Sequence, residues 1–178
     1  MNNLKNMRTY LIGAMDRVND HGIKWREAIT PYLQNLSIEV LNPCIGPIKN
    51  IIEDDTTRYW IDYYKETGQY NKIRNLYGHI RNSDLRCVDI SDFVIAHIDI
   101  GIHACGSYEE IVTANRQKKP TLIWCEQGKR YAPNWLFFML PHEHIFSSMI
   151  ELIDYLNYVN NTKEISKLNR WFFINNRK

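Results

Sequence analysis

The sequence lacks the features that mark membrane, secreted and nucleic-acid-binding proteins. No apolar run approaches the ~20 residues needed to span a bilayer, and the start of the chain, before Asp16, has too short an apolar stretch for a signal peptide. The 22 basic and 20 acidic side chains nearly cancel to a formal net charge of +2, which gives little attraction to nucleic acid or anionic lipid. We therefore expect a cytoplasmic protein whose ligands are small molecules.

Signals for disulfides, cofactors and metals are also missing. The four cysteines form no C-x-x-C pair, which favours reduced thiols. Residues 13–22, GAMDRVNDHG, lack the G-x-G-x-x-G of a dinucleotide fold, and the chain contains no P-loop. His142 and His144 are spaced like a metal-binding pair, but the loop around them supplies no third ligand. We expect neither a cofactor nor a metal.

The chain does contain an alternation of strand and helix patterns along most of its length. With 178 residues and 44% hydrophobic side chains, it is long enough for one well-packed domain. We expect that domain over residues 1–178, with residues 162–178 as a C-terminal extension. Hydrophobic periodicity predicts strands over 9–14, 37–43, 92–99, 120–125 and 143–146, and helices over 23–36, 71–89, 106–118 and 147–159.

This order of elements predicts an α/β protein. Strands that alternate with helices form parallel sheets with right-handed crossovers, so we expect a three-layer flavodoxin-like or Rossmann-like fold with a five-stranded parallel sheet. Residues 44–70 make an unusually long connection with one helical piece, and their aromatic part suits a cover over a ligand. The tail RWFFINNRK is aromatic enough to dock on another surface, with a neighbouring subunit as one option.

Acidic residues gather where a ligand is expected. Open parallel sheets bind ligands beyond the carboxyl ends of their strands, which here are followed by the segments 13–16 and 99–110. The acidic residues at or near these segments are Asp16, Asp84, Asp99, Glu109 and Glu110. A cleft that holds several carboxylates suits metal binding, or chemistry at a carbon that becomes electron-poor.

The segment GSYEEI, residues 106–111, allows two interpretations. S-x-x-E is the pattern of a capping box, in which Ser107 caps the helix and Glu110 reaches back to the Ser107 amide. Alternatively, a carboxylate in the first helical turn faces the positive end of the helix dipole, which favours its ionised form and makes it a nucleophile. Glu109 and Glu110 point about 100° apart around the helix axis, so only one of them can face the edge of the sheet.

Four segments together resemble the nucleoside 2-deoxyribosyltransferase family, with its related 2-deoxyribosyltransferase-like proteins. They are YLIGAMD (10–16), NSDLRCVDISDFVIAHID (82–99), CGSYEEIVTANRQKKP (105–120) and PNWLFFML (133–140). The resemblance covers roughly residues 8 to 156. Each motif alone is weak, and their order and spacing carry the likeness.

The resemblance implies a role for several residues. The nucleophilic glutamate of the family falls on Glu110, and the aspartate that handles the nucleobase falls on Asp84. Gly13 matches a glycine that lets the base approach, and Asn134 matches an asparagine that reaches a neighbouring subunit's sugar site. The family often has an aspartate six residues before the nucleophile, where this chain has Ala104. Asp16 also belongs to the expected substrate site, and Asp99 or His103 is expected to replace the missing aspartate.

The implied activity is transfer of a 2-deoxyribosyl group between nucleobases by double displacement, a reaction of nucleotide salvage. Glu110 attacks C1′, and Asp84, with a raised pKa, protonates the departing base. The resemblance also implies a homo-oligomer whose sites are completed by a neighbouring subunit.

Two alternatives remain open at this point. The first is an N-glycoside hydrolase of a nucleoside 5′-monophosphate or another nucleotide, and the second is a non-catalytic nucleotide-sensing module. A phosphate site needs a helix N-terminus and a nearby cation, and the first loop offers only Arg17. Because the expected 5′ region holds Asp99, the sequence favours a substrate with a free 5′-hydroxyl.

Overall fold

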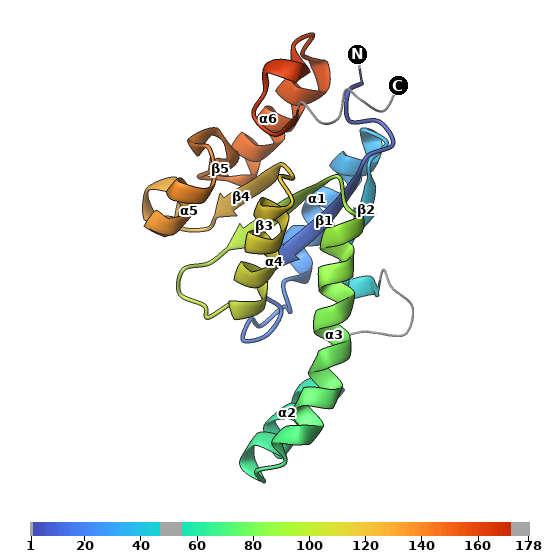
Figure 1. Cartoon of the computed structure of the whole chain (residues 1–178), viewed down its shortest axis with the longest axis vertical. Coiled ribbons are helices and arrows are strands. Elements are labelled where there is room, and N and C mark those ends of the chain that lie inside the picture. The colour runs from blue at the N-terminus through green and yellow to red at the C-terminus, as the bar shows by residue number, and fades with distance from the viewer. Residues whose placement is uncertain (1, 47–54, 172–178) are drawn as a thin grey trace.

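Five parallel strands form the centre of the protein and confirm the predicted fold class. The computed structural model describes residues 2–46 and 55–171. The strands lie in the order β2-β1-β3-β4-β5, which is the flavodoxin-like order. Figure 1 shows the sheet running through the molecule. Its strands are β1 (Arg8–Gly13), β2 (Glu39–Leu41), β3 (Phe93–Ile98), β4 (Thr121–Cys125) and β5 (Ile145–Phe146).

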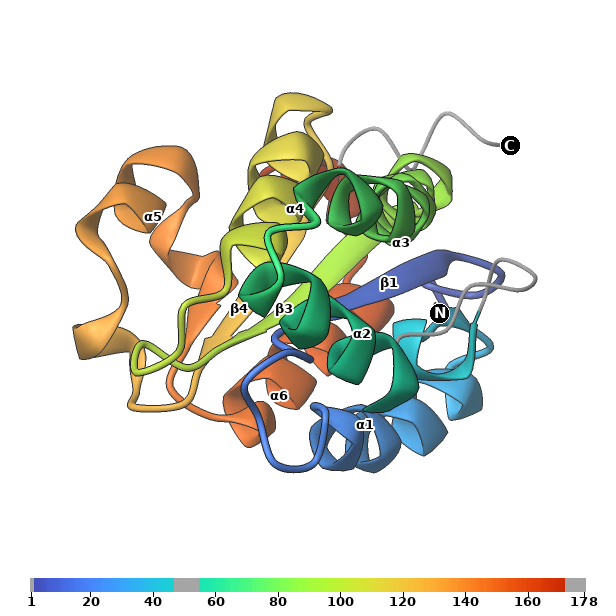
Figure 2. The ribbon, with the colours of Figure 1, turned by 90° about the horizontal axis from the view of Figure 1, so that it is seen from below.

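Helices cover both faces of this sheet and complete the three layers (Figure 2). One face packs against α1 (Ile23–Asn35) and α6 (Met149–Asn161), and the other against α3 (Tyr70–Ile90) and α4 (Cys105–Arg116). The remaining helices are α2 (Asp55–Glu66), which contacts α3, and the short α5 (Asn134–Met139). Single 3-10 turns are η1 (Pro43–Ile45), η2 (Lys129–Tyr131), η3 (His142–His144) and η4 (Ile165–Lys167). In the described part of the chain, no helix is both long enough and apolar enough to cross a bilayer.

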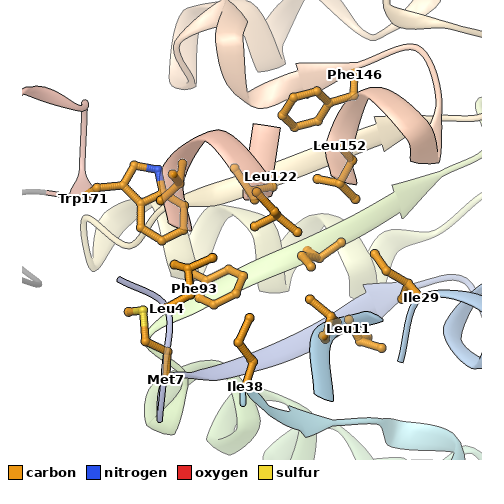
Figure 3. Packing of buried hydrophobic residues seen from close by; sticks show 14 of the residues in the cluster. Leu4, Met7, Leu11, Ile29, Ile38, Phe93, Leu122, Phe146, Leu152 and Trp171 are labelled. Atoms are coloured by element: carbon orange, nitrogen blue, oxygen red, sulfur yellow. The ribbon is translucent and has the colours of Figure 1, made fainter. Parts of the chain in front are cut away.

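The central strands are apolar throughout because both of their faces are covered. Along β3, Phe93 and Ile95 join the cluster under α1 and α6, whereas Val94 and Ala96 join the cluster under α3 and α4. Successive side chains of a strand point to opposite faces, so a strand buried on both sides has no polar position in its interior. Figure 3 shows the first cluster, where side chains from the sheet meet those of α1 and α6.

Several predicted boundaries differ from the observed ones. Helix α4 begins at Cys105, earlier than predicted. Helix α6 begins at Met149, later than predicted, after the cap residue Ser148, whose side chain accepts a hydrogen bond from the Glu151 amide. Helix α5 was not predicted, because its apolar residues follow no helical period. The helical piece expected within residues 44–70 is confirmed as α2, and residues 47–54 of that connection lie outside the described residues.

The described part of the aromatic tail docks on the protein's own core. Trp171 is fully buried, with its ring centroid 5.3 Å from that of Phe93. Its indole Nε1 donates a hydrogen bond to the Tyr155 hydroxyl over 3.0 Å, which satisfies the one polar atom of the side chain. The docking surface for this residue is therefore the face of the sheet under α6, and residues 172–178 lie outside the described residues.

We expect Trp171→Ala to lower the free energy of unfolding by about 3–5 kcal/mol, because it leaves a large cavity in the core. The matched control is Ile150→Ala, since the Ile150 side chain is 71% exposed and its loss is expected to change stability by less than about 0.5 kcal/mol. Urea denaturation of both variants measures the difference. Equal stabilities would contradict the docking of the tail.

Candidate active site

A cavity of about 380 Å³ opens at the carboxyl edge of the sheet, beside the end of β1. Its walls come from the loop after β1 (residues 13–17), the middle of α3 (residues 77–85) and the segment that leads into α4 (residues 103–110). Tyr10 and Pro43 complete the lining. Sites for small molecules have volumes of about 300–1,000 Å³, so a ligand of nucleoside size fits this cavity.

The carboxyl group of Glu110 faces this cavity from the first half of α4. Only 7% of the Glu110 surface is exposed, and its Oε1 accepts a hydrogen bond from the Tyr10 hydroxyl over 3.0 Å. The buried face of α4 consists of Ser107, Glu110, Ile111 and Ala114, which follow the i, i+3, i+4, i+7 spacing of one helix face. Glu110 is therefore held against the sheet by the same stripe that packs the helix.

Glu109 points away from this face, and the helical period predicts that one of the two glutamates does so. Its carboxylate pairs with the guanidinium of Arg81 on α3, whose Nε donates to Oε2 over 2.8 Å. This pairing lowers the pKa of Glu109. The pair lies at the partly exposed rim of the cavity, so Glu109 is ionised and already has a cationic partner.

Burial sets the proton affinity of Glu110. Loss of solvation raises its pKa to about 8, and the charge of Asp84 adds to this effect. The hydrogen bond from Tyr10 and the charge of Arg26 act in the opposite direction, but they are weaker. The expectation that the helix N-terminus keeps this carboxyl ionised at neutral pH is therefore wrong, because desolvation outweighs the stabilising contacts.

The capping-box interpretation of residues 107–110 is also wrong. The N-cap of α4 is Ala104, which makes no side-chain hydrogen bond, so Ser107 lies inside the first turn and Glu110 inside the second. A serine cap with the same S-x-x-E pattern does occur at Ser148 and Glu151, where the serine Oγ accepts from the Glu151 amide over 3.2 Å. The Glu151 carboxylate accepts from the Ser147 amide over 2.7 Å.

A buried arginine holds the loop after β1 in place. Arg26 on α1 is fully buried and donates to the carbonyl oxygens of Leu11, Gly13 and Gly22 over 3.2, 2.8 and 2.8 Å. Gly22 has a φ of 68°, a left-handed conformation that glycine adopts without strain. The guanidinium also stacks on Trp25, 4.7 Å from the ring centroid. One cation thus fixes both ends of the loop that forms a wall of the cavity.

Four of the other predicted site residues line the same cavity, namely Gly13, Asp16, Asp84 and His103. Asp84 is half-buried on α3. Asp16 forms an exposed ion pair with Arg17, in which Oδ2 of the aspartate lies 3.9 Å from Nε of the arginine. A Cβ on Gly13 would come within 3.0 Å of the Trp25 ring and 3.2 Å of the His97 carbonyl oxygen, so close packing accounts for this glycine independently of a ligand.

Asp99 and Asn134 lie elsewhere. The Asp99 carboxylate accepts hydrogen bonds from the Gly101 amide over 2.8 Å and from Gln127 Nε2 over 2.7 Å. It thus closes the turn after β3 and does not line the cavity. Asn134 is exposed at the start of α5 and is also absent from the cavity wall.

Three residues that shape the site were not predicted, namely Tyr10, Arg26 and Arg81. Tyr10 lies within an apolar strand pattern, where nothing local distinguishes a core tyrosine from one that donates to a carboxylate. Arg26 had a usable signal, because it occupies the apolar face of α1 together with Ile29 and Leu33. A cation at such a position must find buried acceptors.

The aromatic part of the long connection does not cover the cavity. On α2, Trp60 stacks on Tyr64 with ring centroids 5.6 Å apart, and none of these rings lines the cavity. Figure 1 shows α2 and the first turns of α3 extending beyond the sheet. Arg58 of α2 donates to the Met15 carbonyl, so α2 touches the loop after β1 from outside.

The two candidate metal ligands are occupied in other ways. His144 is buried, its Nε2 lies 2.9 Å from the Tyr155 hydroxyl, and burial lowers its pKa to about 4. His142 is paired with Glu143 at the surface. Among residues 2–46 and 55–171, no three His, Cys, Asp or Glu side chains are grouped to hold a metal ion.

Comparison with solved structures identifies two proteins of the same fold. The chain aligns with a 2-deoxyribosyltransferase from Bacillus psychrosaccharolyticus with a TM-score of 0.57 and 14% identity, over 89% of this chain and 94% of that one. It aligns with the "2-desoxiribosyltransferase from Leishmania mexicana" with a TM-score of 0.56 and 14% identity, over 85% and 98%. For a CMP N-glycosidase from Clostridium botulinum the TM-score is 0.46, with 19% identity over 84% and 98%.

No protein-family model matches the sequence, and neither does any curated protein. At 14% identity the structural likeness establishes the shared fold, and the activity is left to the chemistry of the site.

The raised pKa of Glu110 makes stability depend on pH. The folded protein binds the proton of this group more tightly than the unfolded chain, whose pKa is near 4.5. The contribution of Glu110 to the free energy of unfolding is therefore fully present below pH 4.5 and is lost as the pH rises towards about 8. We expect Glu110→Gln to be more stable than the wild type by a margin that grows across this interval to a few kcal/mol, measured by urea denaturation at several pH values.

The control for this experiment is Glu109→Gln. Because the folded pKa of Glu109 is lowered, its ionised form contributes stability that is present above its unfolded pKa and is lost as pH falls. Glu109→Gln is therefore expected to lose a little stability at neutral pH. A constant difference between Glu110→Gln and the wild type from pH 4.5 to 8 would show that Glu110 is not desolvated.

Proposed function

We propose that the protein breaks the N-glycosidic bond of a nucleoside-type substrate and transfers the 2-deoxyribosyl group to another nucleobase through a covalent bond to Glu110. The observation that carries this proposal is the buried carboxyl group of Glu110, facing a cavity of about 380 Å³ at the carboxyl edge of the sheet. The fold shared with two 2-deoxyribosyltransferases supports it.

In the first step, a carboxylate oxygen of Glu110 bonds to C1′ of the sugar while the bond from C1′ to the base nitrogen breaks. The sugar passes through an oxocarbenium-like transition state, as in retaining glycosidases. Asp84, which lines the same cavity, protonates the departing base. The products of this step are a neutral base and a glycosyl ester of Glu110.

In the second step, a nitrogen of the incoming base attacks C1′ and the ester bond to Glu110 breaks. The incoming base loses its proton to the carboxylate of Asp84, which restores the starting state. Water in place of the base would give the free sugar, so transfer and hydrolysis differ only in the acceptor.

One proton shared by Asp84 and Glu110 suits both steps. The charge of Asp84 raises the pKa of Glu110, which means that the two groups resist ionising together. At neutral pH the raised pKa keeps this proton mainly on Glu110, and the reacting state is the one in which Asp84 holds it and Glu110 is ionised. Tyr10 and Arg26 lower the pKa of Glu110 and so reduce the free energy needed to reach that state.

We also propose a homo-oligomer in which α5 of one subunit packs near the cavity of the neighbouring subunit. The proposal is supported by the exposure of Trp135 and Phe138, whose surfaces are 70% and 80% exposed. Large apolar side chains grouped in this way are typical of interaction surfaces. Asn134, at the start of the same helix, is exposed as well.

A transfer assay tests the proposed reaction directly. The protein is incubated with 2′-deoxynucleoside donors, offered free and as 5′-monophosphates, together with a different free base. We expect the new deoxynucleoside or deoxynucleotide to form, and mass spectrometry of the quenched enzyme to find the pentosyl group on Glu110. Glu110→Ala is expected to lose both signals, whereas Glu109→Ala keeps them because that carboxylate is paired with Arg81.

The other outcomes of the assay are equally informative. Free sugar without a new glycoside identifies a hydrolase. Ligand binding without turnover or adduct identifies a sensing module and ends the enzymatic proposal.

Two variants are expected to move the pKa of Glu110 in opposite directions. Tyr10→Phe removes a hydrogen bond that lowers this pKa, so the pH at which kcat/KM reaches half its maximum should rise above about 8. Asp84→Asn removes a charge that raises the pKa of Glu110, so the pH midpoint of kcat/KM should fall. Loss of the proposed acid also slows the reaction. Glu109→Gln, the smallest of these influences, serves as control. Shifts of the same sign would contradict the proposed roles.

A further inference from the structure

We infer that Arg58 is a positioning residue for the cavity, because from helix α2 it holds the part of the loop after β1 that forms a wall of the substrate site. The inference rests on the proposed function, since it assumes that the substrate occupies the cavity in front of Glu110. Arg58 itself takes no part in the chemistry, because it does not line the cavity.

The loop after β1 is anchored at its two ends by Arg26. This residue donates hydrogen bonds to the carbonyl oxygens of Gly13 and Gly22, which leaves the segment between them without support from α1. Residues 13–17 all line the cavity. The shape of the substrate site therefore depends on where the middle of this loop lies.

The middle of the loop receives its support from α2. Among the described residues, Arg58 alone makes a hydrogen bond to the backbone of residues 15–17, by donating from Nη2 to the Met15 carbonyl oxygen. Arg17 and His21 have φ values of 62° and 54°, in the left-handed region that residues other than glycine adopt rarely. Such backbone conformations persist where the surrounding structure holds them, and Arg58 supplies a contact of this kind.

The Arg58 side chain is partly buried against this loop. Its Nη1 lies 3.5 Å from Nε2 of His21, which belongs to the same loop. Its Nε is buried and has no hydrogen-bond partner among the described residues. Burial of a guanidinium is unfavourable unless its contacts compensate, so the contacts with Met15 and His21 account for the position of this side chain.

Helix α2 connects the loop to another wall of the cavity. Ile61, which lies on α2 three residues after Arg58, is 4% exposed, and α2 packs against α3 (Figure 1). The middle of α3 forms that second wall and carries Asp84. Arg58 thus joins the loop after β1, through α2, to the helix that bears the proposed acid.

The walls of the cavity and the reacting groups depend on different elements. Glu110 and Asp84 lie on α4 and α3, so release of the loop after β1 leaves both helices in place. An interaction that supports substrate binding equally in the ground state and the transition state changes KM and not kcat. Loss of Arg58 is therefore expected to weaken substrate binding and to spare the chemical step.

Kinetic constants test this positioning role. We expect Arg58→Ala to raise KM at least about 10-fold, as for the loss of a charge-assisted hydrogen bond, and to leave kcat within about 3-fold of the wild type. The pH midpoint of kcat/KM should not move, because Glu110 and its neighbours are unchanged. Arg58→Lys, which keeps the charge and a donor, should recover part of the loss.

The matched control is Arg74→Ala, which removes an exposed arginine of α3 that does not line the cavity. It is expected to leave KM and kcat unchanged. If Arg58 only stabilised the fold, Arg58→Ala would reduce the amount of active protein, so kcat would fall while KM stayed constant. That result, or unchanged constants, would overturn the inference while the proposed function stands.

Limited proteolysis reports on the loop without any need for turnover. The Arg17 side chain is 62% exposed, and trypsin cleaves the peptide bond after it when the loop opens. Because slow cleavage tracks the population of the open form, we expect Arg58→Ala to be cleaved after Arg17 at least about 10-fold faster than the wild type. Arg74→Ala should be cleaved there at the rate of the wild type.

The proteolysis also separates this inference from the proposed function. Faster cleavage of Arg58→Ala, without turnover of any glycoside by the wild type, would support the positioning of the loop and reject the proposed reaction. Unchanged cleavage after Arg17 would overturn the positioning role, whatever the activity of the wild type.

Discussion

The buried carboxyl group of Glu110 is the constraint on which the site depends. Removing this group from water raises its pKa to about 8, and the single hydrogen bond from Tyr10 does not compensate. A fold gains no stability from such a group at neutral pH. Perturbed acids in cavities are concentrated at functional sites, so the cost of burying Glu110 supports the proposal that this residue takes part in chemistry.

The elements around Glu110 hold it in place without neutralising it. Arg26 fixes the loop after β1 through three carbonyl oxygens and acts on the carboxyl only at a distance. Arg81 is already paired with Glu109. Arg26 and Arg81 thus shape the walls of the cavity, and the carboxyl group of Glu110, the proposed nucleophile, is left poorly solvated.

The sequence predicted the fold well because periodicity reports burial, and burial follows from the layered architecture. The helix period also predicted that only one of Glu109 and Glu110 faces the sheet, and the family resemblance pointed to Glu110. It did not predict the partners of polar atoms. Two S-x-x-E patterns, at Ser107 and Ser148, look alike in sequence, yet only the second forms a cap. Helix α4 begins at Cys105, before Ser107, and the Glu110 side chain packs inwards. Asp99 illustrates the same limit, since its turn partners lie far along the chain or are backbone groups.

The raised pKa and the proposed catalysis are two consequences of one environment. A desolvated carboxylate is destabilised when nothing positive is near it, and it interacts strongly with any cation that enters the same low-dielectric space. The sugar becomes positive only in the transition state, so the interaction that the resting protein lacks is gained at that moment. Glu110 and Asp84 are then stabilised together with the oxocarbenium-like sugar. Differential stabilisation of this kind needs no movement of the protein, because Tyr10 and the buried face of α4 already hold the carboxyl in position.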